Sequence, residues 1–270
     1  MAKNIFIEGL QGSGKTTLLR KLSKVHPEYK AYYEGDISPV ELAWCSYMGK
    51  DDFDKILKEY AYVKDEILKY TKTEGDRYIT AYTRVLAEKR EFYEQMESFE
   101  IYNGRVPYPQ FHDIIMERYR SFVKRFVNGE EGTGNLFECS FFQNSMESMM
   151  LYYQRTDEEI TEFYREAFQV LREADFKMYY LNSDNIRENI LQIKKERSDT
   201  DGNELWYPLM QAYLNESPYG KAHGYQGLED MLAHFERRHA LERKIIEEVL
   251  GEACSVLKAK EYSLDEISNY

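Results

Sequence analysis

Two hydrophobic patterns alternate along the chain. Short runs of apolar, mostly branched or aromatic residues are typical of buried strands, and such runs stand at residues 5–7, 30–33, 135–139, 176–181 and 255–259. Between them, apolar residues recur every three or four positions, as in the helix predicted at 16–25. Single strands that alternate with helices predict a parallel sheet, in which the carboxyl ends of all strands share one edge. Ligands bind at that edge in such folds.

The segment 51–127 has a different pattern from the rest. Its apolar residues recur at helical spacing without strand-like runs between them, so we expect mainly helices there. A glycine-rich break at 129–134 separates this segment from the third predicted strand. The sequence contains no internal repeat and no linker rich in Gly, Pro or Ser. It therefore predicts one α/β domain over 1–270 with a helical insertion at about 50–130.

Charge and cysteine content narrow the functional classes. The 36 Lys and Arg against 48 Asp and Glu give a formal net charge of −12, which disfavours binding to nucleic acid polymers or anionic membranes. The N-terminal apolar run is too short for a signal peptide, and no run approaches the ~18 residues of a membrane span. Cys45, Cys139 and Cys254 form no pairing motif for a disulfide framework or zinc. We expect a soluble cytoplasmic protein; a homodimer is left open.

The turn after the first strand predicts a phosphate site. Residues 9–16, GLQGSGKT, fit the pattern G-x-x-x-x-G-K-[ST] between a strand and a helix. In this P-loop, backbone N–H groups and the helix N-terminus face phosphate oxygens, the lysine bridges the β and γ phosphates, and the hydroxyl binds Mg²⁺. We therefore expect a P-loop NTPase three-layer sandwich of about five parallel strands flanked by helices. ATP and Mg²⁺ would be its cofactors, bound by Gly9, Gly12, Ser13, Gly14, Lys15, Thr16 and Thr17.

Other features favour a phosphotransferase over a GTPase or a motor. The nearest match to a guanine-reading motif, TKTE at 71–74, has the wrong last residue, and the acid-terminated strand typical of motors is represented only by the short 136–138. Small phosphotransferases need an acid near the acceptor, a mobile basic lid and an acceptor pocket. The chain has candidates for all three.

The candidate bases are Glu34 and Asp36, which follow the second strand at the ligand edge and could deprotonate an acceptor hydroxyl. The alternative is a loop turn, or an N-cap at Asp36 or Ser38 for a helix starting within 39–42. Trp44 and Tyr47, expected on that helix, would stack on an acceptor ring or pack in the core. Arg105 of the insertion is a further candidate for binding the acceptor.

The third strand and the segment 183–205 supply the remaining candidates. Glu138 ends its strand and would hold a Mg²⁺-bound water beside Thr16, or serve only as a capping acid. A lid helix is expected at 183–197, capped by Ser183 or Asp184. Its cations Arg187, Lys194 and Arg197 would face the transferred phosphoryl group, unless the helix is simply a solvated one of mixed charge.

Two further expectations concern packing. We expect His234 and His239, on a long amphipathic helix beside arginines, at the surface. We expect Met146, Met149 and Met150, at helical spacing, in the core.

Several motifs together resemble thymidylate kinases and the related deoxynucleoside kinases. The run 6–10, FIEGL, leading into GSGKTT at 12–17 is similar to the opening of both families. Glu34, followed by Pro39 and Trp44, resembles the deoxynucleoside-kinase segment in which a Glu is the base and a Trp packs by the nucleoside. Residues 138–140 resemble the Glu-Arg-Ser of that family, 194–197 its lid, and 256–267 the closing strand and adenine-side loop of both families.

The resemblance implies an ATP- and Mg²⁺-dependent kinase whose small-molecule substrate is a nucleoside or nucleotide. Cys139 stands where both families have an acceptor-holding arginine, and no arginine lies between 32 and 36, which favours a hydroxyl acceptor without a phosphate. Arg77, Arg105 or Arg118 could substitute for the missing arginines. The alternatives are an ATP-binding regulatory protein without kinase activity and a kinase of a non-nucleoside hydroxyl acceptor.

Overall fold

A computed structural model of the protein describes residues 3–263 and 267, which divide into two compact units. The first unit combines Met1–Ala31 with Val123–Tyr270, and the second is Tyr32–Phe122. The second unit thus contains most of the segment expected as an insertion, and it begins earlier, at the end of the second strand. Among the described helices, none is both long and apolar enough to cross a lipid bilayer.

The first unit is built on a five-stranded parallel sheet in the order β2-β6-β1-β7-β8. Its strands match the five predicted ones and are β1 (Asn4–Gly9), β2 (Lys30–Tyr32), β6 (Asn135–Glu138), β7 (Phe176–Asn182) and β8 (Cys254–Lys258). Every residue of β1 is buried, because β1 is the central strand and helices flank the sheet. The predicted α/β fold with a parallel sheet is therefore confirmed. Of the loop expected after β8, residues 264–266 lie outside the described part of the chain.

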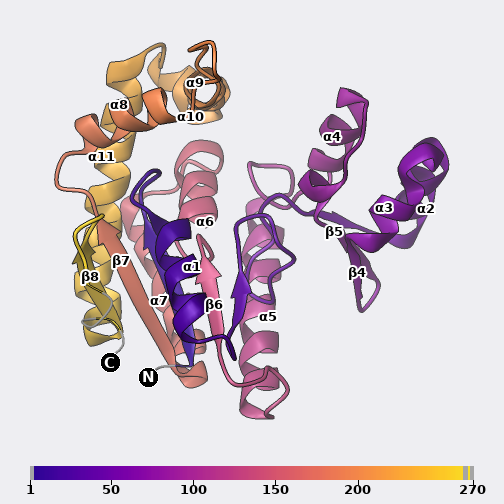
Figure 1. The fold of residues 1–270 in the computed structure, drawn as a ribbon, viewed down its shortest axis with the longest axis horizontal. Coiled ribbons are helices and arrows are strands. Elements are labelled where there is room, and N and C mark those ends of the chain that lie inside the picture. The colour runs from indigo at the N-terminus through magenta and orange to yellow at the C-terminus, as the bar shows by residue number, and fades with distance from the viewer. Residues whose placement is uncertain (1–2, 264–266, 268–270) are drawn as a thin grey trace. The chain divides into compact units, whose positions relative to one another are not determined.

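Helices of the first unit follow the strands in the expected alternation. They are α1 (Lys15–Val25), α6 (Gln143–Glu147), α7 (Asp157–Leu171), α8 (Ile186–Glu196), α9 (Trp206–Glu216), α10 (Pro218–His223) and α11 (Leu228–Ile245). α1 buries Leu18, Leu19 and Leu22 and packs against β1 and β6. α7 begins with a capping box in which Thr156 and Glu159 satisfy each other's backbone N–H groups. Figure 1 shows α8 beyond the carboxyl end of β7.

Aromatic rings fill much of the core of this unit. The ring of Phe6 on β1 lies 4.8 Å from that of Phe137 on β6 and 4.7 Å from that of Phe176 on β7, measured between centroids. The expected core methionines Met146, Met149 and Met150 are fully buried in the segment after β6. Aromatic residues make up 15% of the chain, and part of this content is thus explained by packing across the sheet.

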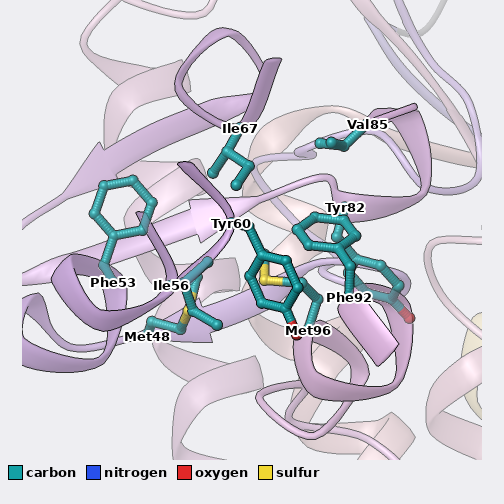
Figure 2. Packing of buried hydrophobic residues seen from close by; sticks show 9 residues of the cluster. All are labelled: Met48, Phe53, Ile56, Tyr60, Ile67, Tyr82, Val85, Phe92 and Met96. Atoms are coloured by element: carbon teal, nitrogen blue, oxygen red, sulfur yellow. The ribbon is translucent and has the colours of Figure 1, made fainter. Parts of the chain in front are cut away.

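The second unit contains a small antiparallel sheet, in the order β3-β5-β4, that the sequence analysis did not predict. Its elements are β3 (Ser46–Met48), α2 (Lys50–Glu59), α3 (Lys64–Lys69), β4 (Thr71–Glu74), β5 (Arg77–Thr80) and α4 (Arg90–Glu97); α5 (Tyr108–Val127) starts here and ends in the first unit. Figure 2 shows its core, in which Met48 of β3, Phe53 and Ile56 of α2, and Phe92 and Met96 of α4 meet.

The helix expected to begin within 39–42 is absent, since residues 37–45 form bends, turns and irregular chain. Acidic side chains bond to the backbone there: the Asp36 carboxylate accepts from the N–H of Tyr33 at 2.8 Å, and the Glu41 carboxylate accepts from that of Ala43 at 2.8 Å. Such local bonds compete with helix formation and explain the error.

Candidate functional site

The glycine loop, residues 9–16, joins β1 to α1 at the carboxyl edge of the sheet. Gly9, Gly12 and Gly14 have φ angles of 137°, 76° and 97°, a region that favours glycine. Two of these positions also leave no space for a side chain. A Cβ on Gly9 would lie 2.6 Å from the Leu181 carbonyl oxygen, and one on Gly12 would lie 2.3 Å from Cγ1 of Ile193.

Lys15 folds back over the glycine loop. Its ammonium donates hydrogen bonds to the carbonyl oxygens of Gly9 at 2.7 Å and Leu10 at 3.0 Å. Gly14 precedes α1 without a side-chain cap, so no side chain of the cap residue covers the helix N-terminus. The hydroxyl of Ser13 is fully buried and makes no hydrogen bond to the described residues. A positive charge, a helix N-terminus and an unsatisfied hydroxyl therefore gather in one bend, as an anion site requires.

Thr16 and Glu138, the two residues expected at the metal site, are in contact. The Thr16 hydroxyl donates a hydrogen bond to the Glu138 carboxylate, which is 5% exposed. Mg²⁺ takes oxygen ligands and is usually held by one or two protein groups together with waters and substrate phosphates. The pair fits such an ion. The described residues contain no cluster of three His, Cys, Asp or Glu that could hold a metal, so an all-protein cage is not formed here.

A buried acid, Glu8, lies directly before the glycine loop and was not singled out from the sequence. One carboxylate oxygen accepts from the Phe141 N–H at 2.7 Å, and the other has no partner among the described residues. Burial raises the pKa of Glu8 to about 7, although the Phe141 N–H and the charge of Lys15 act in the opposite direction. The sequence feature that could have indicated a functional role for Glu8 is its position as an acid directly after the apolar run 5–7 of β1.

The expected lid helix exists as α8, but its N-cap is Asn185 rather than Ser183 or Asp184. The Asn185 side chain accepts the hydrogen bond of the Glu188 N–H, so it is the N-cap. α8 contacts the glycine loop through residues that the sequence analysis did not assign to the site. Asn189 donates to the Gln11 carbonyl oxygen at 2.7 Å, and Ile193 lies over Gly12.

The three expected lid cations have separate partners within the first unit. Arg187 pairs with Glu229 of α11 at 2.5 Å, and Lys194 pairs with Glu204 at 3.2 Å. The Arg197 guanidinium lies 5.9 Å from the ring centroid of Trp206. Each would have to exchange its partner to bind a phosphoryl group.

The two histidines expected at the surface are in fact buried or half-buried. His234 is 1% exposed, and its Nε2 lies 2.7 Å from the Glu147 carboxylate. The Nε2 of His239 lies 2.8 Å from the Asn182 side-chain oxygen, and burial lowers the pKa of His239. The helix itself was predicted correctly. Both histidines face the interior because hydrogen-bond partners, the Glu147 carboxylate and the Asn182 amide, lie there.

Glu34 and Asp36, the two candidate bases, belong to the second unit and have different partners. Glu34 accepts from the indole N–H of Trp44 at 3.1 Å. Asp36 pairs with Arg84 at 2.5 Å, in addition to its bond with the Tyr33 N–H. The second unit thus brings Glu34 together with Trp44, one of the expected substrate residues.

The expected substrate residues occupy other elements than predicted. Trp44 lies in a turn with φ of 60°, a strained value for a bulky residue, and is 45% exposed. Tyr47 is in strand β3, with the Arg77 guanidinium 5.2 Å from its ring centroid. Arg105 pairs with Glu97 and lies 3.8 Å from the Glu100 carboxylate. The expectation of a helix carrying both Trp44 and Tyr47 is wrong.

Two buried acids of the second unit were missed because nothing in their local sequence marks them. Burial raises the pKa of Glu41 to about 8 and that of Glu100 to about 7. The Glu100 carboxylate accepts from the Tyr82 hydroxyl at 2.6 Å. Arg118, also buried, pairs with Glu74 at 2.8 Å and donates to the Ser38 carbonyl oxygen. The interior of this unit therefore contains several buried ionisable groups, of which the sequence analysis had named only Arg118, as a possible substitute for a missing arginine.

Comparison with protein-family models finds no match to the chain, and no curated protein matches it either.

Proposed function

We propose that the protein is an ATP- and Mg²⁺-dependent phosphotransferase acting on a small molecule of the nucleoside or nucleotide class. The observation that supports this most directly is the glycine loop with Lys15 folded over it and the Thr16–Glu138 pair beside it. Phosphoryl transfer depends on positioning and charge neutralisation, and these groups are the ones that would provide both.

In this proposal the loop amides and the N-terminus of α1 bind the β and γ phosphates. The Lys15 ammonium would leave the carbonyl oxygens of Gly9 and Leu10 and donate to phosphate oxygens instead. Thr16 and Glu138 would hold Mg²⁺, which when bound neutralises phosphate charge. Arg187, Lys194 and Arg197 would contact the transferred group after leaving their present partners.

The candidate groups for the acceptor lie within the second unit. We favour Glu34 as the base over Asp36, because Glu34 lies beside Trp44, one of the expected substrate residues, whereas Asp36 is bound by the Arg84 guanidinium. Trp44, exposed and held by Glu34, would stack on a planar acceptor, with Tyr47 and Arg105 as further contacts.

A screen of acceptors tests the proposal. ADP release from Mg·ATP would be measured alone and with nucleosides, nucleotides and other hydroxyl metabolites, using Lys15→Ala as the inactive control. A kinase of the proposed class releases ADP faster only with nucleosides or nucleotides. Stimulation only by another hydroxyl compound would change the acceptor class. ATP binding without stimulation by any acceptor would instead favour a regulatory protein, and the absence of Mg·ATP binding would overturn the proposal.

A further inference from the structure

The guanidinium of Arg238, on α11, is fully buried and reaches three different segments of the first unit. Nε donates to Glu242 of the same helix at 2.7 Å, and Nη1 donates to Glu147 of α6 at 2.6 Å. Nη1 also donates to the side-chain oxygen of Gln11 at 3.2 Å. Gln11 belongs to the glycine loop, 227 residues earlier in the chain.

The carboxylates of Glu147 and Glu242 already compensate the positive charge of the buried Arg238 guanidinium. Burial alone would raise the pKa of Glu147, but the charges of His234 and Arg238 outweigh it and lower that pKa to about 2. Glu242 accepts a further hydrogen bond from the Tyr180 hydroxyl at 2.7 Å. A buried ion network of this kind is weak evidence for net stabilisation, so stability alone does not account for the added bond to the loop.

Gln11 is held at two points. Its side chain accepts from Arg238 of α11, and its carbonyl oxygen accepts from Asn189 of α8. The next residue, Gly12, has the left-handed φ of 76° and lies under Ile193. Fixing both the side chain and the carbonyl of Gln11 restricts the orientation of the peptide units that follow it, at residues 12–14.

We propose that Arg238 is a positioning residue of the glycine loop, which acts through the side chain of Gln11 to hold the loop amides in a phosphate-binding arrangement. This inference rests on the proposed function in that the anion concerned is the triphosphate. The inference assigns a role in phosphate binding to Arg238, a residue far from the loop in sequence, which would act through Gln11 without contacting phosphate or acceptor. The guanidinium preorganises the loop and so reduces the ordering cost of binding.

A double-mutant cycle tests the proposal. Gln11→Met removes the acceptor but keeps a chain of similar length, and Arg238→Lys keeps the charge but loses the fork that reaches Gln11. Each single variant is expected to raise the Kd for Mg·ATP about 10-fold by calorimetry, and the double variant no more than either single one. Gln192→Met, on the exposed side of α8, is the control with unchanged Kd. A native Kd in Gln11→Met, or additive effects, would overturn the proposal.

Hydrogen exchange provides a second readout that does not depend on ATP binding or on the folding of Arg238→Lys. In Gln11→Met without ligand, the amides of residues 12–14 are expected to exchange about 10-fold faster than in the native chain, with an unchanged melting temperature. Unchanged exchange would overturn the positioning role. If the native chain fails to bind Mg·ATP, the proposed function fails, while this measurement still decides whether Arg238 orders the loop.

Discussion

The hydroxyl of Thr16, in the first turn of α1, donates a hydrogen bond to the carboxylate of Glu138 at the end of β6. The two residues are 122 positions apart. They meet because β1 and β6 are neighbouring parallel strands, with Ile7 opposite Glu138, and the chain turns from β1 directly into α1. The two side chains that we propose for the Mg²⁺ site therefore come from separate motifs to one place.

Glu138→Gln is expected to raise the Mg²⁺ concentration needed for half-maximal activity about 10-fold, because the amide keeps the shape of the side chain but loses its charge. Magnesium titration at fixed ATP measures the change. Glu173→Gln, at an exposed acid of the same unit, is the control. An unchanged magnesium requirement in Glu138→Gln would remove this residue from the metal site.

Lys15→Ala is expected to lower turnover by at least about 100-fold, because the charge on the phosphates loses its main protein partner. The fold should persist, since the substitution removes only two hydrogen bonds among the described residues, those to the carbonyl oxygens of Gly9 and Leu10; the cost is about 1–2 kcal/mol. Turnover and thermal unfolding are measured together, with the exposed Lys24→Ala as the control. Native turnover in Lys15→Ala would exclude the loop from the mechanism.

Gly12→Ala and Gly132→Ala form a matched pair, since both glycines have φ of 76° but only the Cβ on Gly12 would meet other atoms. Each substitution is expected to lower the free energy of unfolding by about 1 kcal/mol, because alanine disfavours the left-handed conformation. Gly12→Ala must in addition displace Ile193, so we expect a larger loss of stability and at least about 10-fold weaker Mg·ATP binding. Thermal unfolding and calorimetry would show this, and equal effects of the two variants would contradict it.

Glu34→Gln is expected to lower kcat by at least about 100-fold while Mg·ATP binds as before, because only proton removal from the acceptor is affected. The single-turnover rate with the best acceptor and calorimetry with Mg·ATP separate the two steps. An unaltered rate in Glu34→Gln together with a slow Asp36→Asn would assign the base to Asp36.

The stability of the second unit should depend on pH through Glu41. Burial raises the pKa of its carboxyl from 4.5 to about 8, so the folded unit keeps a proton that the unfolded chain has released. This contribution to stability is present below pH 4.5 and is lost as the pH rises toward 8. Glu41→Gln cannot titrate, so its stability relative to the native chain should grow with pH, by up to about 1.4 kcal/mol per unit. Denaturant unfolding at about pH 5 and pH 8 measures the difference. A constant difference would contradict the prediction.

The sheet and the glycine loop could be predicted because both are encoded in contiguous residues. The strand at 5–7 is a continuous apolar run, and the loop is a contiguous motif that opens a helix. The hairpin of β4 and β5 was missed because Thr71–Glu74 is entirely polar and lacks the usual strand pattern.

The buried polar contacts could not be predicted for a different reason. His234 and Glu147 lie 87 residues apart, and Arg238 and Glu147 lie 91 apart. Each of these residues has an ordinary position on an amphipathic helix, and only the packing of α6 against its neighbours decides that the charged groups meet inside. The contacts between Gln11, Asn189 and Arg238 have the same long-range origin.

The division of the chain into units sets an order of events during synthesis. All of residues 32–122 leave the ribosome before any residue of β6, β7 or β8, so the second unit can complete its own core while the first is still unfinished. The central strand β1 emerges first but must wait for β6 and β7 before both its edges are paired. Until then its apolar side chains and unpaired backbone groups remain exposed, and nascent chains stalled between residues 122 and 176 should be the ones that depend most on chaperones.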